Sequence, residues 1–160
     1  MEEQLDQIMA VMDASFDPQW GEAWNRRQVR DALTTPNTHC LLAHGAPPSA
    51  TGEAAAHGFL LSRAAPGEEE ILLLAVCPQQ RRQGIASELV TSFIADAARR
   101  GAVQVFLEVR ENNPAITFYQ LHGFVPVGRR RDYYRQIDGT RLDALTFAFK
   151  IKDQADADID

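Results

Sequence analysis

Six consecutive apolar residues, Ile71 to Val76, constrain the fold of this chain more than any other segment. A strand with one face in water alternates apolar and polar residues, so an unbroken apolar run predicts a strand that is covered on both faces. The run ends at Cys77-Pro78, and an amphipathic segment with helical spacing follows from Ile85. The chain therefore predicts a central strand of a sheet that leads through a short loop into a helix.

The loop between these two elements, Arg81 to Ala86, is basic and contains one glycine. Free backbone N–H groups and the positive end of the helix dipole make a helix start of this kind suited to binding phosphate. Gly84 fits a position where the backbone takes a positive φ or where a ligand approaches closely, and arginine can bind phosphate through two hydrogen bonds. By itself the pattern R-x-x-G-x-A is weak, and a polar loop with a helix cap is the alternative.

Composition and charge exclude several classes of protein. The chain has 160 residues, of which 45% are hydrophobic and 24% charged, as in an ordinary globular protein. A net charge of −6 argues against general nucleic-acid binding and would attract a basic peptide or an amine. No apolar stretch is as long as a membrane span, and the acidic N-terminus lacks the features of a secretion signal. Two cysteines, Cys40 and Cys77, make neither a disulfide framework nor a metal site, which favours the reducing cytoplasm.

The other predicted elements complete a mixed α/β fold. We expect a mostly antiparallel sheet flanked by helices on both faces, in a single domain over residues 1–152, followed by a short acidic tail, 153–160, without fixed structure. A flexible connection is expected from Gly45 to Ser49. The predicted helices carry Leu5, Ile8, Met9 and Met12; Val29 and Leu33 after an Asn25–Gln28 capping pair; Leu89, Val90, Phe93, Ile94 and Ala97; and a short segment from Asn113-Pro114 to Gly123. The predicted strands are 40–43, 55–62, 71–76, 103–110, 125–127 with 130–134, and 145–151, with a hairpin turn at Asp138-Gly139.

Two motifs together resemble a known superfamily. Leu74-Ala75-Val76-x-Pro78, followed by Arg81-x-x-Gly84-x-Ala86, is similar to the signature of the GNAT superfamily, the acetyl-CoA-dependent N-acetyltransferases. The resemblance extends from about Leu5 to Lys152, and Ala86 stands where glycine is common. Further motifs resemble the RimI branch of this superfamily, the bacterial ribosomal-protein-alanine acetyltransferases. They are Leu107-Glu108-Val109-Arg110-x-x-Asn113, Tyr119-x-x-x-Gly123-Phe124, Tyr133-Tyr134, Asp138-Gly139, Asp143-Ala144 and Trp24 with Val29.

The resemblance implies acetyl-CoA as cosubstrate and no metal. It places the pyrophosphate on the loop amides and the pantetheine arm between strands 74–76 and 107–109, with a backbone N–H near Val76 facing the thioester oxygen. For Asn113, capping of a helix is an equally good explanation. The cofactor-binding residues that the resemblance implies are Leu74, Ala75, Val76, Arg81, Arg82, Gln83, Gly84, Ile85, Ala86, Ser87 and Asn113.

Two proton-handling residues follow from the same resemblance. It implies that Glu108 is the general base that takes a proton from the acceptor ammonium, and that Tyr119 is the general acid that protonates the CoA thiolate. Spacing alone favours other roles, an exposed strand residue for Glu108 and a helix aromatic packed on the sheet for Tyr119. Likewise, Arg129-Arg130-Arg131 is explained by a solvated sheet edge and His122 by its place at a helix end.

The acceptor implied by the RimI branch is a protein N-terminus, the N-terminal alanine of small-subunit ribosomal protein eighteen. A peptide α-amine has a pKa of about 8 and lysine one of about 10.4, so the neutral α-amine is a few hundred times more abundant at neutral pH. The resemblance implies that Trp24, Tyr133 and Tyr134 line the peptide groove, although aromatic core filling remains an alternative. Acetylation of a polyamine or aminoglycoside and a non-catalytic acyl-CoA sensor also stay open. No nucleic acid and no membrane is expected as a partner, and the chain is expected to be a monomer or a weak dimer.

Overall fold

The computed structural model describes residues 1–17, 22–45 and 55–152. Its six strands form one sheet in the order β1-β2-β3-β4-β6-β5, in which β3 and β4 are parallel and the β4–β6 and β5–β6 pairs are antiparallel. The mixed α/β class predicted from the sequence is confirmed. The elements are α1 (Glu2–Ser15), α2 (Arg26–Thr34), β1 (Thr38–His44), β2 (Ala56–Ala65), β3 (Glu68–Val76), the 3₁₀ turn η2 (Pro78–Gln80), α3 (Ile85–Arg99), β4 (Gln104–Arg110), α4 (Ala115–Leu121), β5 (Val125–Arg135) and β6 (Arg141–Lys150).

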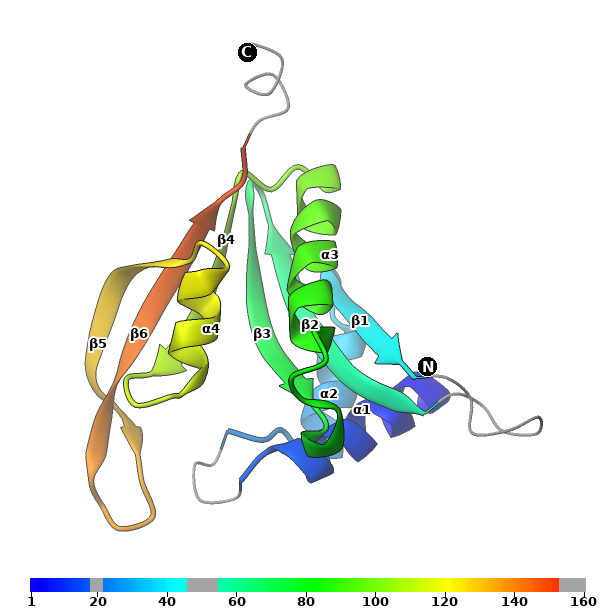
Figure 1. The fold of residues 1–160 in the computed structure, drawn as a ribbon, viewed down its shortest axis with the longest axis horizontal. Helices are drawn as coiled ribbons and strands as arrows, with labels where there is room; N and C mark the ends of the chain where they lie inside the picture. The colour runs from blue at the N-terminus through cyan, green and yellow to red at the C-terminus, as the bar shows by residue number, and fades with distance from the viewer. Residues whose placement is uncertain (18–21, 46–54, 153–160) are drawn as a thin grey trace. The chain divides into compact units, whose positions relative to one another are not determined.

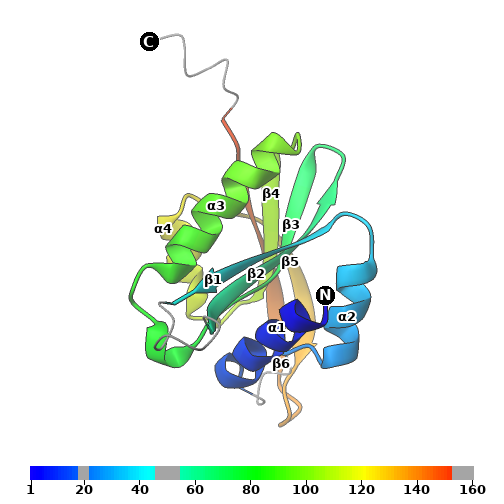
Figure 2. The ribbon, with the colours of Figure 1, turned by 90° about the vertical axis from the view of Figure 1, so that its right-hand side faces the viewer.

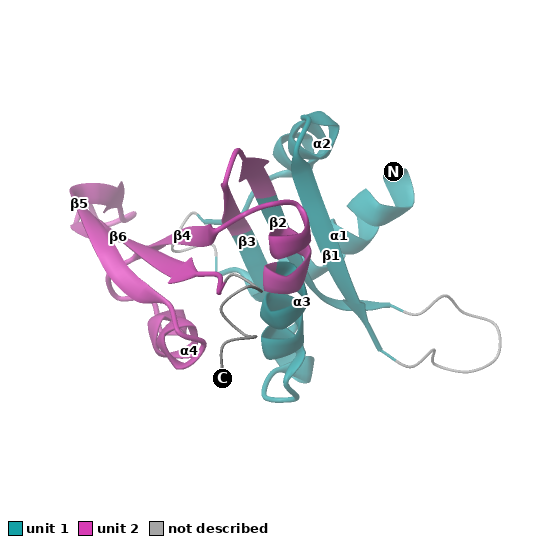
Figure 3. Cartoon of the chain, turned by 90° about the horizontal axis from the view of Figure 1, so that it is seen from above, with its two compact units in different colours: residues 1–62, 73–93 teal, residues 63–72, 94–160 magenta. Residues whose placement is uncertain are grey.

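The chain divides into two compact units (Figure 3). Unit 1 contains residues 1–62 and 73–93, and unit 2 contains residues 63–72 and 94–160. Strands β2 and β3 and helix α3 each contribute residues to both units. The single domain expected over residues 1–152 stays a prediction. The acidic tail at 153–160 and most of the connection expected at Gly45–Ser49 lie outside the described residues.

Helices α1 and α2 of unit 1 form as the sequence predicts and lie side by side (Figure 2). The predicted stripe on α1 is confirmed for Leu5, Ile8 and Met12, whereas Met9 is half-buried and Val11 takes its place in the core. The capping pair that opens α2 is also confirmed. The Asn25 side chain accepts a hydrogen bond from the Gln28 N–H at 2.9 Å, and the Gln28 side chain accepts one from the Asn25 N–H at 2.8 Å.

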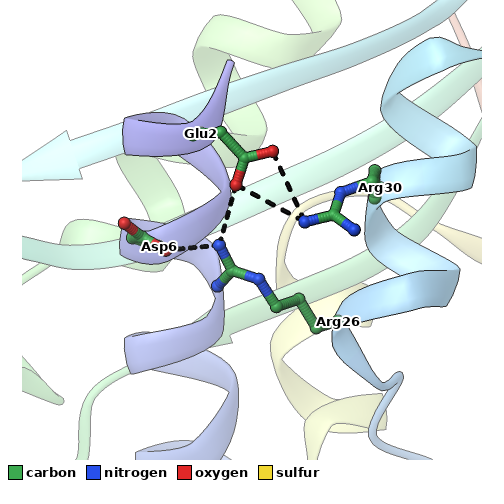
Figure 4. Close-up of polar contacts among 4 residues, drawn as sticks. All are labelled: Glu2, Asp6, Arg26 and Arg30. Carbon is green, nitrogen blue, oxygen red and sulfur yellow. Dashed lines mark hydrogen bonds and ion pairs between the residues drawn. The ribbon is translucent and has the colours of Figure 1, made fainter.

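Ion pairs join the outer faces of these two helices (Figure 4). Arg26 binds Glu2 at 3.0 Å and Asp6 at 2.6 Å, and Arg30 binds Glu2 at 3.4 Å. Hydrogen bonds to these carboxylates raise the pKa of Arg26. All four side chains are largely exposed, so screening by solvent keeps the contribution of these pairs to stability small.

Strand β3 has β2 on one side and β4 on the other, which confirms the central strand predicted from its apolar run. Ile71, Leu73 and Ala75 are buried, and Leu72 and Leu74 between them are half-buried. The strand begins at Glu68, three residues earlier than the apolar pattern indicates. Glutamates can form the start of this strand because the buried one, Glu69, is paired with Arg100.

Glu69 and Arg100 form an ion pair in unit 2 between the start of β3 and the end of α3. The Glu69 side chain is fully buried, and the Arg100 guanidinium donates to both of its carboxylate oxygens, at 3.1 and 2.6 Å. A buried carboxylate is tolerated only when it is paired and hydrogen-bonded. The cluster Arg99-Arg100-Gly101 therefore ends α3 as predicted, and one of its cations also neutralises a buried charge.

The rest of unit 2 consists of β4, α4 and a long β5–β6 hairpin, with α4 beside the strands (Figure 1). Gly123, at φ 89°, turns the chain after α4, and the Phe124 N–H donates to the Tyr119 carbonyl at 3.0 Å. Phe124 and Phe147 are buried. The two predicted strand pieces of β5 form one irregular strand, because the register shifts between Arg130 and Tyr134.

Asp143 of β6 holds this irregular part of β5. Its carboxylate accepts hydrogen bonds from the Asp132 N–H at 2.9 Å and from Arg129 at 2.5 Å. Asp132 has a φ of 54°, a left-handed conformation that a non-glycine residue rarely adopts. These hydrogen bonds, the one from Asp132 first, lower the pKa of Asp143. An ionised Asp143 thus stabilises the bend of the edge strand.

We expect Arg100→Leu to destabilise the protein by about 2–3 kcal/mol, because Glu69 would remain buried without its main counter-charge. The double variant Glu69→Leu/Arg100→Leu should recover most of this loss. Urea denaturation measures both. An unchanged free energy of unfolding for Arg100→Leu would show that the pair is not needed.

A second prediction concerns pH. The pKa of Asp143 is lowered in the folded state, so its stabilising effect is fully present above its unfolded pKa, near 3.8, and is lost as the pH falls through the folded pKa. Asp143→Asn should therefore melt at a lower temperature than the wild type at pH 7, and the difference should shrink as the pH falls below 3.8 through the folded pKa of Asp143. Circular dichroism melts between pH 2.5 and 7 test this, and equal melting temperatures at pH 7 would refute it.

Candidate functional site

The loop after β3 in unit 1 has the backbone that the sequence indicates for a phosphate loop. Arg82 and Gly84 both have positive φ, 65° and 81°, and α3 begins at Ile85. The Glu88 N–H donates to the Gly84 carbonyl at 3.0 Å, which forms the first turn of the helix. A Cβ at position 84 would meet no atom within 4 Å. In the described structure glycine is therefore required by its φ and not by lack of space.

The two arginines of the loop have different roles, which their adjacent positions do not indicate. Arg81 donates from Nε to the Val76 carbonyl at 3.3 Å and from a terminal nitrogen to the Ser15 carbonyl at 3.2 Å. The Ser15 hydroxyl donates to the same Val76 carbonyl at 3.3 Å. Arg81 thus joins the end of α1 to the end of β3. Arg82 is exposed.

The other residues expected to bind the cofactor lie mainly around this loop. At the end of β3, Leu74 is half-buried and Ala75 and Val76 are buried. Gln83 is exposed, and Ile85, Ala86 and Ser87, half-buried, make the first turn of α3.

Asn113 belongs to unit 2, where it precedes α4. Its side-chain oxygen accepts a hydrogen bond from the Ala115 N–H at 2.9 Å. The capping role weighed for this residue is confirmed. Its contact with a cofactor stays a prediction. The cap is compatible with such a contact, because this hydrogen bond uses the side-chain oxygen and not the amide NH₂ group.

Glu108, the expected general base, lies in β4 and lines a charged pocket of unit 2. Its side chain is 20% exposed, and one of its oxygens lies 3.3 Å from Nε of Arg130 in β5. The pocket has a volume of about 260 Å³. It is lined by five charged residues, Arg63, Glu68, Glu70, Glu108 and Arg130, and by Ala64, Ala65, Phe106, Leu107 and Thr146.

Glu70 of β3 shares this pocket with Glu108. Partial burial raises the pKa of Glu70, and the nearby Glu108 carboxylate raises it further, while Arg63 and Arg130 oppose the shift. A carboxylate that holds its proton more strongly than usual is a better proton acceptor when ionised. The pocket therefore brings three acidic side chains and two guanidinium groups together at one place on the sheet.

Tyr119, the expected general acid, is buried in α4, 6% exposed. Its ring makes edge-to-face contacts with Phe118 and Phe124, at centroid distances of 5.3 and 5.7 Å. The packing role weighed for this side chain is thus present. A role of its hydroxyl in proton transfer stays a prediction.

The three residues expected to bind a peptide lie in both units. Trp24, half-buried in unit 1, comes directly before the N-cap of α2. In unit 2, Tyr133 is 54% exposed and its ring makes an edge-to-face contact with Tyr134 at 5.2 Å. The Arg130 guanidinium lies over the Tyr133 ring, 5.3 Å from its centroid. Arg130 therefore connects the expected base with an expected groove residue.

Four charged pocket residues, Arg63, Glu68, Glu70 and Arg130, were not identified as site residues from the sequence. Arg130 belongs to the run expected as a solvated sheet edge, and β5 is indeed an edge strand. Arg129 and Arg130 nevertheless form ion pairs, with Asp143 and Glu111 and with Glu108 respectively. The only signal for Glu70 in the sequence is an acidic residue directly before the predicted strand 71–76, while Glu108 lies within the predicted strand 103–110. The proximity of the two residues becomes visible only when the strand register is known.

The two cysteines and the possible metal ligands are the remaining candidate groups among the residues that the structure describes. Cys40 and Cys77 are free, and burial raises the pKa of the Cys40 thiol to about 12. Residues 1–17, 22–45 and 55–152 contain no group of three or more His, Cys, Asp or Glu that could hold a metal ion. Within the same ranges, no helix is both long and apolar enough to cross a membrane.

Solved structures share this fold. The ribosomal-protein-S18-alanine N-acetyltransferase from Escherichia coli matches with a TM-score of 0.78 at 24% identity, over 96% of this chain and 91% of that chain. Arabidopsis thaliana NAA60 in complex with acetyl-CoA matches with a TM-score of 0.69 at 21% identity, over 80% and 84%. At these identities the likeness shows the fold alone.

Sequence comparison gives the family. Residues 5–124 match the model of the Acetyltransferase (GNAT) family. The N-alpha-acetyltransferase RimI of Mycobacterium tuberculosis is 36% identical over 130 residues, 81% of this chain and 75% of that protein. The ribosomal protein bS18-alanine N-acetyltransferase of Escherichia coli is 36% identical over 94 residues, 58% of this chain and 63% of that protein's length. Because the family model covers most of the chain, the chain belongs to the acetyltransferase (GNAT) family.

Proposed function

We propose that this protein transfers the acetyl group of acetyl-CoA to the α-amine of a protein N-terminus, and that its acceptor is the N-terminal alanine of small-subunit ribosomal protein eighteen. The family and the relatives that act on ribosomal protein bS18-alanine support this proposal. The single observation that carries it is the position of Glu108, in a charged pocket open to an acceptor. A carboxylate there is suited to take a proton from an ammonium group.

The proposed reaction assigns one proton transfer to each of two residues. Glu108 takes a proton from the acceptor ammonium, and the neutral nitrogen attacks the thioester carbonyl carbon. A backbone N–H near Val76 would stabilise the oxyanion that forms. The C–S bond then breaks, and Tyr119 donates its hydroxyl proton to the CoA thiolate. The acetylated nitrogen releases its second proton to water, water returns a proton to the Tyr119 phenolate, and Glu108 releases its proton to water before the next cycle. The products are the N-acetylated acceptor and CoA.

The acceptor class follows from proton chemistry. A single carboxylate base can deprotonate an α-ammonium group, with a pKa of about 8, far more easily than a lysine side chain, with a pKa of about 10.4. The exposed Tyr133 beside Arg130 offers an aromatic surface near Glu108 for the first residues of a peptide. The pKa difference favours an α-amine over a lysine side chain, and the aromatic surface favours a peptide as the acceptor.

The cofactor proposal depends on the loop after β3. Its two residues at positive φ and the helix start at Ile85 make a backbone of the kind that binds pyrophosphate. Arg81 and Arg82 are both exposed, and Arg81 uses two of its nitrogens to bind the carbonyls of Val76 and Ser15. We therefore assign Arg82 to the phosphates of CoA and Arg81 to holding the loop in place.

We expect Glu108→Gln and Tyr119→Phe each to lower kcat by about 10²-fold or more on a peptide with an N-terminal alanine. Release of the CoA thiol measures the rate, and mass spectrometry locates the acetyl group. Glu3→Gln, a matched change on the exposed surface of α1, serves as the control.

The acceptors to compare with this peptide are the same peptide with a blocked N-terminus, a polyamine and an aminoglycoside. If the polyamine or the aminoglycoside is acetylated faster than the peptide, that small amine and not the peptide is the acceptor. CoA binding without turnover of any amine would favour a sensor and contradict the proposal.

The two loop arginines should respond differently to substitution. Arg82→Gln is expected to weaken CoA binding by about tenfold at low salt, and by less as salt rises, with an unchanged melting temperature. Arg81→Gln should lower stability by about 1–2 kcal/mol, because two charge-assisted hydrogen bonds to backbone carbonyls are lost. Calorimetric titration with CoA at two salt concentrations and thermal melts test both. Unchanged CoA affinity in Arg82→Gln would remove this residue from the proposed cofactor site.

A further inference from the structure

The strand register of unit 2 places several charged side chains on the same face of the sheet. Glu70 of β3 is opposite Phe106 of β4, and Glu108 lies two residues further along β4. Side chains of opposed residues, and of residues two apart, point to the same face of a sheet. Glu70 and Glu108 therefore face the same side, as their shared pocket requires.

The antiparallel strands extend this face. Thr146 of β6 is opposite Glu108, and Arg130 of β5 is opposite Ala144, two residues from Thr146. Arg63, at the end of β2, and Glu68, at the start of β3, complete the charged lining. Backbone pairing and the pocket thus agree on which side chains meet.

The net charge of the pocket would be balanced by one monovalent cation. Three carboxylates and two guanidinium groups line it, so it carries one net negative charge when all are ionised. Arg130 is committed to Glu108 at 3.3 Å and to the Tyr133 ring. Glu70 has the Glu108 carboxylate as the neighbour that most opposes its ionisation. A primary ammonium group in the pocket would relieve the repulsion between the two carboxylates and neutralise the net charge.

We infer that Glu70 is a second acceptor-binding residue, which holds the ammonium group of the incoming substrate together with Glu108. This inference rests on the proposed function for the identity of the acceptor, an α-ammonium group at a peptide N-terminus. Glu70 binds and orients the ammonium group, and the proton is transferred to Glu108. Arg63 and Arg130 oppose the rise in the pKa of Glu70 and so favour its ionised form.

The test is the isosteric variant Glu70→Gln, measured with a peptide that begins with alanine. We expect the KM for the peptide to rise about tenfold, since one ionic hydrogen bond is lost, with kcat changed less than threefold and the KM for acetyl-CoA unchanged. Glu70→Asp should recover part of the affinity. Glu3→Gln should match the wild type. An unchanged peptide KM in Glu70→Gln would overturn the inference.

Peptide binding, measured by calorimetry in the presence of CoA, separates this inference from the proposed function. The free peptide should bind Glu70→Gln about tenfold more weakly than the wild type, whereas an N-acetylated peptide, which has no ammonium group, should bind both equally. Equal loss for both peptides would show a general effect of the substitution and refute ammonium recognition. The free peptide could bind Glu70→Gln more weakly while the wild type shows no turnover of the peptide. That result would support the inference and contradict the proposed function. Failure of the free peptide to bind the wild type would refute the inference.

The pH dependence gives an additional readout. The pKa of Glu70 is raised, by partial burial first and by Glu108 next, with Glu68 adding to the shift and Arg63 and Arg130 opposing it. Protonation of Glu70 should therefore weaken peptide binding as the pH falls, and it should do so at a pH above the ordinary range of a glutamate. In Glu70→Gln this acid limb of 1/KM for the peptide should be absent. An acid limb identical to that of the wild type would contradict the assignment.

Discussion

The backbone register of β3, β4 and β6 is the constraint on which the charged pocket of unit 2 depends. Because side chains alternate between the two faces of a sheet, a slip of one residue would move a strand's side chains to the other face. The pairs Glu70–Phe106 and Glu108–Thr146 place the acidic side chains of β3 and β4 on one face. On the other face, Glu69 is buried and paired with Arg100. Three consecutive glutamates, 68 to 70, therefore contribute to a structural ion pair on one face of the sheet and to the charged pocket on the other.

Charge pairing divides the arginines of this chain into two classes. Arg81 and Arg100 bind groups inside the protein, the carbonyls of Ser15 and Val76 and the carboxylate of Glu69. Arg82 and Arg130 are exposed residues, as Arg81 and Arg100 are, and Arg130 pairs with Glu108 in the charged pocket and lies over the Tyr133 ring. A guanidinium group can bind a planar carboxylate, a carbonyl or an aromatic face, so residue type alone does not indicate which of these an arginine will choose. The contacts in the structure show which groups of the protein each of these arginines binds.

Local chemistry explains why much of the fold was predictable. The helix spacing of Leu5, Ile8 and Met12, the Asn25–Gln28 capping box and the turn at Gly123 depend on residues within one or two turns of each other, and all are found as predicted. The apolar run Ile71–Val76 likewise predicts a central strand, because only a strand covered on both faces tolerates such a run. The start of β3 at Glu68 was missed, since the partner of Glu69 comes from a helix thirty-one positions away in the sequence.

The sequence by itself determined the α/β class, the positive-φ glycine of the loop, the cap at Asn113 and the family, because these depend on short-range patterns and on motifs with fixed spacing. Only the tertiary structure decided that Arg81 is used within the fold, that Arg130 pairs with Glu108, and that Glu70 shares a pocket with that residue. Each of these facts joins side chains from different strands or helices. Their proximity is set by strand order and register, and neither can be read from the spacing of residues along the chain.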